Sequence, residues 1–96
     1  MANTKNETPD YIVENDGFAV ITLASPAVIS GEKTETIRMR EPTVGDMKRM
    51  QKHKGDEADR EIFGMANLCE VAPEDIERLS LRNFGRMQEA FGLFTS

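Results

Sequence analysis

Residues 40–47 read Arg-Glu-Pro-Thr-Val-Gly-Asp-Met, and the character of the chain changes at this octet. Before it, β-branched residues alternate with polar ones; after it, apolar residues recur at helical spacing. Pro42 cannot donate to a sheet ladder and pushes the preceding residue towards an extended conformation. Thr43 is a candidate N-cap that Asp46 completes as a capping box. We therefore expect Pro42, Thr43, Gly45 and Asp46 to form a structural hinge and cap between a sheet and a helical half.

Composition bounds the class of protein. The chain has 96 residues, 39% of them hydrophobic, and a net charge of −5, which fits one small domain with a modest core. The acidic balance argues against a general nucleic-acid binder, because phosphate neutralisation requires a clustered basic face. One cysteine excludes an intrachain disulfide, no apolar run approaches the ~18 residues of a membrane span, and no signal peptide is apparent. We expect a soluble protein in the cytoplasm.

The N-terminal part is polar, and residues 1–16 are expected to form a flexible arm that precedes a single domain at residues 17–96. After Met1 and Ala2, the hydrophobic residues there are Tyr11, Ile12 and Val13. Their β propensity leaves open a second interpretation, in which they form a short edge strand or a docking element.

Residues 17–41 are expected to form a β-hairpin. Residues 18–23 are rich in β-branched and aromatic side chains and predict the first strand, which the segment around Pro26 breaks or bends before residues 27–29 resume pairing. A turn follows at residues 30–32, and residues 33–40 predict the return strand, with Glu35, Ile37 and Met39 on one face.

Residues 42–96 are expected to be helical. Capping residues and apolar spacing predict helices over about 43–52, from Asp56 to about Cys69, from Pro73 to about Leu79, and from Ser80 onward. The predicted fold class is therefore α+β, an N-terminal hairpin followed by about four short helices.

No group of residues predicts an active site. The one histidine, His53, lies between two lysines at a helix end, without a carboxylate to orient it. Cys69 falls on an apolar stripe and fits a buried small hydrophobe. Acids at the start of the third helix complement its dipole, and the glycines match no phosphate-binding loop. We expect no enzyme activity, cofactor or metal.

A central group of basic residues stands out in this acidic chain. If the hairpin and the first helix pack together, some of these residues share a surface that could contact nucleic acid or an acidic partner helix. A solvated face interleaved with acidic residues is the simpler interpretation. The group comprises Arg38, Arg40, Lys48, Arg49, Lys52 and Lys54.

The order of these features resembles one known family. The succession of strand, Pro26, Gly31, strand, the octet at 40–47, a helix and Val-Ala-Pro-Glu-Asp-Ile at 71–76 resembles the phage tail assembly chaperones (tail protein E-like) of Mu-like and P2-like contractile-tailed phages. Residues 79–89 resemble that family's ending, so the likeness spans about residues 18–94. The chain departs from the family in carrying Met at 39, 47 and 87, where Leu is frequent, but this exchange conserves volume.

The resemblance implies a cytoplasmic, non-enzymatic protein of the bacterial host that binds the tape measure protein before the tail tube polymerises around it. Further partners that it implies are a second copy of the chain or a longer form made by frameshifting. The alternative function is a small nucleic-acid-associated phage or prophage regulator that uses the central basic group.

Methionine and phenylalanine side chains are the candidate contacts with such a partner. Methionine is flexible and polarizable, which suits a surface that repacks around varied apolar helices. The competing interpretation is that the same stripe is internal core. The candidates are Met47, Met50, Phe84, Met87, Phe91 and Phe94.

Overall fold

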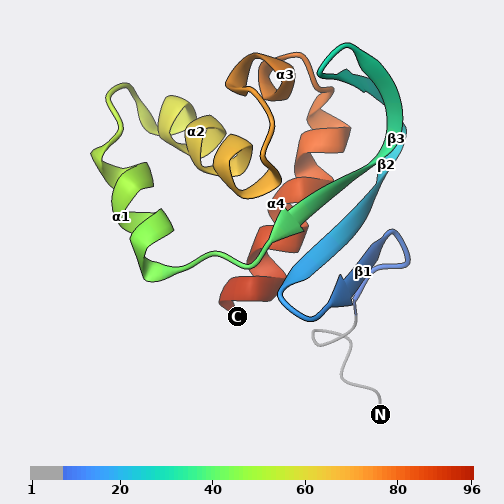
Figure 1. Ribbon diagram of the computed structural model, residues 1–96, viewed down its shortest axis with the longest axis horizontal. Helices are drawn as coiled ribbons and strands as arrows, with labels where there is room; N and C mark the ends of the chain where they lie inside the picture. The colour runs from blue at the N-terminus through green and yellow to red at the C-terminus, as the bar shows by residue number, and fades with distance from the viewer. Residues whose placement is uncertain (1–7) are drawn as a thin grey trace.

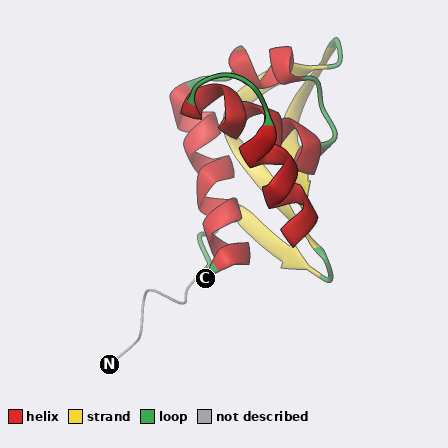
Figure 2. Cartoon of the chain, turned by 90° about the vertical axis from the view of Figure 1, so that its left-hand side faces the viewer, coloured by secondary structure: helices red, strands yellow, loops and turns green. Residues whose placement is uncertain are grey.

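The computed structural model describes residues 8–96, which form a three-stranded sheet covered on one side by helices (Figures 1 and 2). The α+β class predicted from the sequence is confirmed. The elements, in order, are β1 (Ile12–Asn15), β2 (Phe18–Ile29), β3 (Glu32–Arg40), α1 (Val44–Lys52), α2 (Glu57–Cys69), α3 (Pro73–Glu77) and α4 (Leu81–Thr95).

The sheet is antiparallel with the order β1-β2-β3. Ile21 in β2 pairs with Ile12 on one side and with Ile37 on the other, and all three side chains are buried. Because alternate residues of a strand face the same way, this row fixes which face of the sheet meets the helices. The predicted inward face of β3 is confirmed for Ile37 and Met39, which are buried, but Glu35 is exposed.

Strand β1 corrects the expected extent of the N-terminal arm. Residues 1–7 lie outside the described residues, but Ile12–Asn15 belongs to the sheet, as the alternative interpretation allowed. Tyr11 beside it donates its hydroxyl to Glu89 of α4, and the Arg86 guanidinium lies 3.8 Å from the centre of its ring. These contacts join segments far apart in the sequence, so the β propensity of residues 11–13 alone predicted strand β1 only weakly.

Strand β2 continues through Pro26, where the sequence predicted a break or bend. The register against β3 shifts between Thr22 and Ala27, as expected of a bulge that contains a proline. Asn83 of α4 satisfies the backbone there. Its Oδ1 accepts from the Ala24 and Ser25 amides at 2.7 and 3.2 Å, and its Nδ2 donates to the Ser25 carbonyl at 2.9 Å.

The helices begin where their capping residues predict. Thr43 and Asp56 each form a complete capping box, and Ser80 accepts from the backbone amide of Asn83. Pro73 starts α3 at its first turn. No helix within residues 8–96 is long and apolar enough to cross a membrane.

Helices α2 and α4 supply most of the helical core, α4 against β2 and α2 against β3, whereas α1 packs mainly on α2. The first helix therefore lies at the outer side of the helical layer, at the left of Figure 1. The buried apolar residues that join the two layers are Ile12, Ala19, Ile21, Leu23, Ile37, Met39, Met65, Ala66, Leu68, Cys69, Ile76, Met87 and Ala90.

We predict that Asn83→Ala lowers the free energy of unfolding by about 2–4 kcal/mol, because it leaves backbone groups at the β2 bulge without partners. Chemical denaturation followed by circular dichroism measures this. The matched control is Asn67→Ala, at an exposed position of α2, which is expected to change stability by less than about 0.5 kcal/mol. Equal effects of the two substitutions would contradict the assigned role of Asn83.

Candidate functional site

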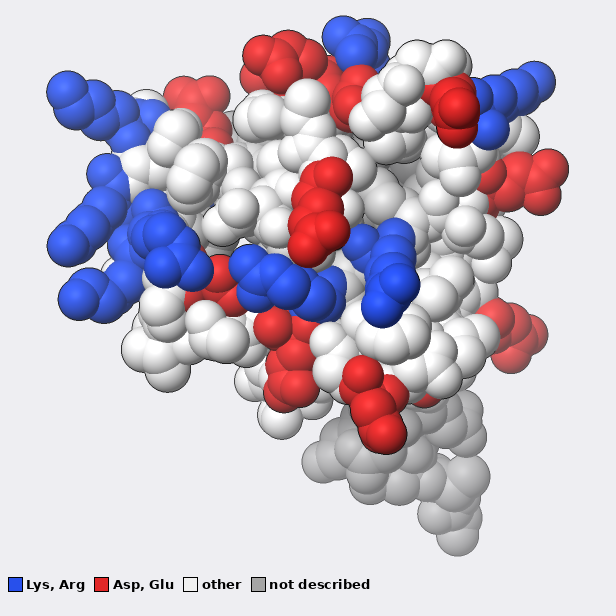
Figure 3. Space-filling view, viewed as in Figure 1, with Lys and Arg blue, Asp and Glu red and all other residues white. Residues whose placement is uncertain are grey.

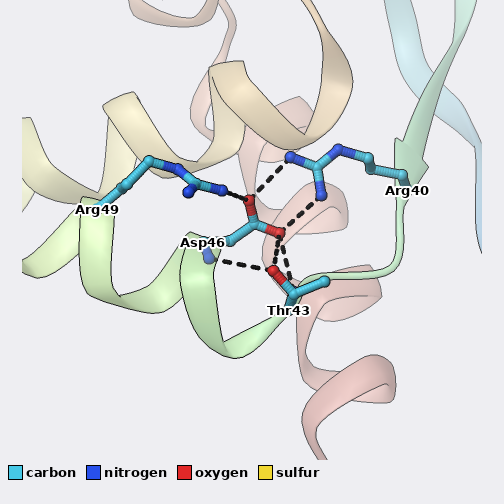
Figure 4. Close-up of polar contacts among 4 residues, drawn as sticks. All are labelled: Arg40, Thr43, Asp46 and Arg49. Atoms are coloured by element: carbon cyan, nitrogen blue, oxygen red, sulfur yellow. Dashed lines mark hydrogen bonds and ion pairs between the residues drawn. The ribbon is translucent and has the colours of Figure 1, made fainter.

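The octet that divides the chain forms a compact polar cluster around the buried carboxylate of Asp46 (Figure 4). Arg40, at the end of β3, binds both oxygens of this carboxylate at 2.6 and 2.9 Å. Arg49, one turn along α1, adds a contact of 2.7 Å. The amide and hydroxyl of Thr43 donate to Asp46 Oδ2 at 2.8 and 3.1 Å. One carboxylate thus joins the end of β3 to the N-cap of α1 and to the next turn of that helix.

The contacts in this cluster stabilise the ionised form of Asp46. The bidentate Arg40 guanidinium, aided by the Thr43 amide and by Arg49, holds the pKa of Asp46 well below its usual range against the opposing effect of burial. Asp46 is therefore ionised at neutral pH. The two guanidinium groups outweigh its single negative charge, so Asp46 adds no unpaired acid to the surface beside it.

An apolar cavity of about 210 Å³ opens between α1, the C-terminal half of α2 and the end of α4. Val44 and Met47 of α1 form one wall, while Phe91 and Phe94 of α4 form another. Asp46 is the one ionisable residue in the lining, and it is paired. Such a cavity, apolar and open on one side, suits an apolar side chain of a partner.

A second cavity, of about 420 Å³, continues along the same helices and shares Met50, Gly64 and Phe91 with the first. We call the two together the α1–α2–α4 groove. Its α2 side extends from Glu57 to Leu68, about 16 Å or three helical turns. The groove is therefore long enough to hold several turns of a helix.

Gly64 makes the waist of this groove possible. A Cβ at this position would overlap the Met50 sulfur and lie 3.1 Å from Met50 Cγ. The absence of a side chain lets α1 and α2 approach closely, with Met50 over the backbone of α2. The sequence did not single out Gly64, because a glycine inside an otherwise helical pattern is a weak signal.

The candidate contact residues separate into three groups in the structure. Met47, Met50, Phe91 and Phe94 meet in the groove. Phe84 packs against the core and does not line either cavity.

Met87 is fully buried, so in this structure its side chain packs in the core and does not line the groove. It lies on the face of α4 that also carries Asn83 and Ala90, both buried. The stripe read from the sequence is wide enough to face both the core and the groove, and periodicity alone could not divide it.

The central basic residues differ in their contacts. Arg40 and Arg49 bind Asp46, and the Arg38 guanidinium lies 3.9 Å over the Phe18 ring. Lys and Arg side chains instead gather over α1 and the loop that follows it (Figure 3). This division weakens the nucleic-acid interpretation, which requires the six residues to act together.

The other polar residues singled out in the sequence have structural contacts. His53 stacks on the Phe63 ring at 4.1 Å between centroids. Burial raises the pKa of the Cys69 thiol to about 12, so the thiol is protonated and unreactive. Asp75 accepts from the Ser30 amide at 3.0 Å and from Arg78 at 2.6 Å, so it also ties α3 to the β2–β3 turn. Within residues 8–96, no three His, Cys, Asp or Glu side chains form a metal-binding group.

The chain matches the model of a known protein family. The family model described as phage tail assembly chaperone proteins, E, or 41 or 14, matches residues 20–96. No curated protein sequence and no solved structure matched the chain.

We predict that Asp46→Asn lowers the free energy of unfolding by about 2–4 kcal/mol at pH 7, because it leaves Arg40 without its anionic partner. The folded pKa of Asp46 lies below the unfolded value of about 3.9. The stabilisation is therefore complete above that value and is lost as the pH falls below it. Urea denaturation from about pH 7 to pH 2 should show the difference between the two proteins shrinking on acidification. A difference that is constant over this range would contradict the ion pairing.

Proposed function

This chain belongs to the phage tail assembly chaperone family, and we propose that it binds the tape measure protein of its phage through the α1–α2–α4 groove. By this binding it keeps the tape measure protein soluble in the host cytoplasm until the tail tube polymerises. The chain acts by covering apolar surface, so the function requires neither a cofactor nor a catalytic group.

The observation that carries this proposal is the exposure of apolar side chains at the mouth of the groove. Val44 is 74% exposed and Met47 is 48% exposed, on a helix with few other apolar residues. Partly buried Phe91 and Phe94 continue the apolar surface below them. An apolar surface that enters a groove in this way is typical of a protein-binding site.

The shape of the groove supports a helical partner. Its length of about three turns fits an amphipathic helix that inserts apolar residues at helical spacing. Tape measure proteins are long and helical, with apolar stretches that would aggregate if left exposed. Met47 and Met50 suit a site that accepts many such stretches, because methionine adapts to irregular shapes.

Weak contacts repeated along one long partner also fit transient protection. Each chaperone would cover a short segment, and many copies would together cover the tape measure protein. Tube subunits could then displace the copies one at a time, without an energy source.

The direct test is co-expression of this chain with the tape measure protein of the same phage or prophage, followed by size-exclusion chromatography. We expect the tape measure protein to become soluble and to co-elute with several copies of the chain. An insoluble tape measure protein, with this chain eluting alone, would overturn the proposal.

We predict that the double substitution Val44→Ser and Met47→Ser abolishes co-elution while leaving the thermal unfolding transition within a few degrees, because both side chains are largely exposed. The matched control replaces two exposed apolar residues outside the groove, Val28→Ser and Leu81→Ser. Loss of binding in the control, or normal binding in the groove variant, would contradict the placement of the site.

We also predict that Gly64→Ala weakens binding by forcing Met50 out of its place at the waist of the groove. Stability should change by less than about 1 kcal/mol, because Met50 is flexible and alanine favours the helix. Gly92→Ala in α4 is the control, since a Cβ there meets no atom within 4 Å. Equal affinities of the two variants, measured by titration with tape measure peptides, would argue against the waist as a contact.

A further inference from the structure

We infer that the segment bound in the α1–α2–α4 groove is an amphipathic helix with acidic residues on the flank that faces α1. This inference rests on the proposed function and adds to it the charge and the orientation of the partner. The observation behind it is the pair of exposed lysines, Lys48 and Lys52, on α1.

The position of these lysines follows from the geometry of α1. Val44, Lys48 and Lys52 are spaced four residues apart and therefore lie one above the other on one face of the helix. Val44 lines the groove, whereas neither lysine does. At about 100° per residue, Lys48 lies about 40° and Lys52 about 80° around α1 from Val44. The two lysines therefore flank the groove on the outer side of α1, which we call the rim. The neighbouring row holds Met47 and Gln51, which line the first and the second cavity. Apolar contacts and cations are thus offered side by side.

The charge of this rim is opposite to that of the rest of the chain. Residues 44–55 carry a net +3, from Lys48, Arg49, Lys52 and Lys54 against the single acid Asp46. Since the whole chain carries −5, the remaining residues carry −8. Figure 3 shows this cationic side chain group over α1 and its following loop. A partner with acidic residues is attracted to this rim and repelled by most of the remaining surface.

The lysines are available to a partner. The ion pairs found within residues 8–96 join Asp46 to Arg40 and Arg49, and Asp75 to Arg78, and none includes a lysine. Both Lys48 and Lys52 are exposed. Asp46 already pairs with two arginines, so it does not neutralise the charges of Lys48 and Lys52. The cation of Lys52 also lies in the last turn of α1, where it is compatible with the helix dipole.

The α2 wall of the groove determines how the bound helix is rotated about its own axis. On the α2 side, Glu57 and Glu61 line the second cavity together with Arg60. Glu61 accepts from Gln88 of α4 at 2.8 Å, and Arg60 donates to the Gly55 carbonyl at 2.8 Å. An acidic flank turned towards α2 would meet these carboxylates, whereas one turned towards α1 meets lysines. The groove therefore selects one rotation of the bound helix.

The test uses fluorescent peptides of about 25 residues that tile the tape measure protein of the same phage, long enough to cover the three turns of the groove. Fluorescence anisotropy gives the affinity of each peptide for the full chain. The reversed variant is Lys48→Glu with Lys52→Glu, and Lys48→Gln with Lys52→Gln is a milder one in case the first is destabilised. Lys33→Glu with Arg82→Glu, both at exposed positions away from the groove, matches the reversed variant, since each pair changes the net charge from −5 to −9.

We expect the tightest peptides to carry acidic residues beside an apolar face. Their affinity should fall about tenfold in the Lys48/Lys52 reversal, less in the glutamine variant, and little in the control. Raising the salt concentration from about 50 to 500 mM should weaken wild-type binding and leave the reversed variant nearly unchanged. Replacing the acidic residues of one peptide by lysine should restore its binding to the reversed variant.

Two results would overturn the inference. In the first, peptides bind through Val44 and Met47, but reversal of the lysines has no effect; the proposed function then stands without the charged rim. In the second, a mixed-sequence DNA duplex or a poly(U) RNA binds the wild type, the lysine reversal removes that binding, and peptide affinity is unchanged; the lysines then serve nucleic acid. Failure of every tape measure peptide to bind the wild type would instead count against the proposed function itself.

Discussion

The buried carboxylate of Asp46 is the interaction on which the position of α1 depends. This helix packs mainly on α2, so its direction relative to the sheet rests on the bidentate contact with Arg40 at the end of β3. The Thr43 cap starts the helix from the same carboxylate. Since α1 forms one wall of the groove, the ion pair positions this wall relative to the sheet, and the packing of Met50 over Gly64 sets its approach to α2. Bidentate contacts between an arginine and a carboxylate are directional, so this pair adds geometric specificity to the position of α1.

The parts of the fold that could be predicted from the sequence are those encoded locally. Pro42, Thr43 and Asp46 mark the change from sheet to helix with residues adjacent in the chain, and Asp56, Pro73 and Ser80 mark the other helix starts. Strand β1 was given only as an alternative, because its stability comes from pairing with β2 and from the contacts of Tyr11 with α4. The continuity of β2 through Pro26 likewise depends on Asn83, more than fifty residues away.

In the candidate site, too, some features follow from the local sequence and others depend on tertiary contacts. Met47, Met50, Phe91 and Phe94 were found from residue type, and the structure brings them together. Met87 belongs to the same apolar stripe but is buried, because a helix of this length can bury one side of such a stripe and expose the other. Val44 and Gly64 were not selected, since a valine at a helix start and a glycine within a helix have no distinctive sequence signal. The basic group predicted from the sequence includes two arginines that bind Asp46 in the structure. The sequence could not show this, because the pairing depends on tertiary structure.

Hydrogen–deuterium exchange of the complex is the experiment that would locate the surface where this tail assembly chaperone meets the tape measure protein, which we propose to be the α1–α2–α4 groove. Exchange is compared between the chain alone and the chain co-purified with the tape measure protein. We expect slower exchange in α1, along α2 and in the C-terminal half of α4, with the backbone of β1 and β3 unchanged. Protection confined to the outer face of the sheet, with α1 exchanging as fast as in the free chain, would contradict it.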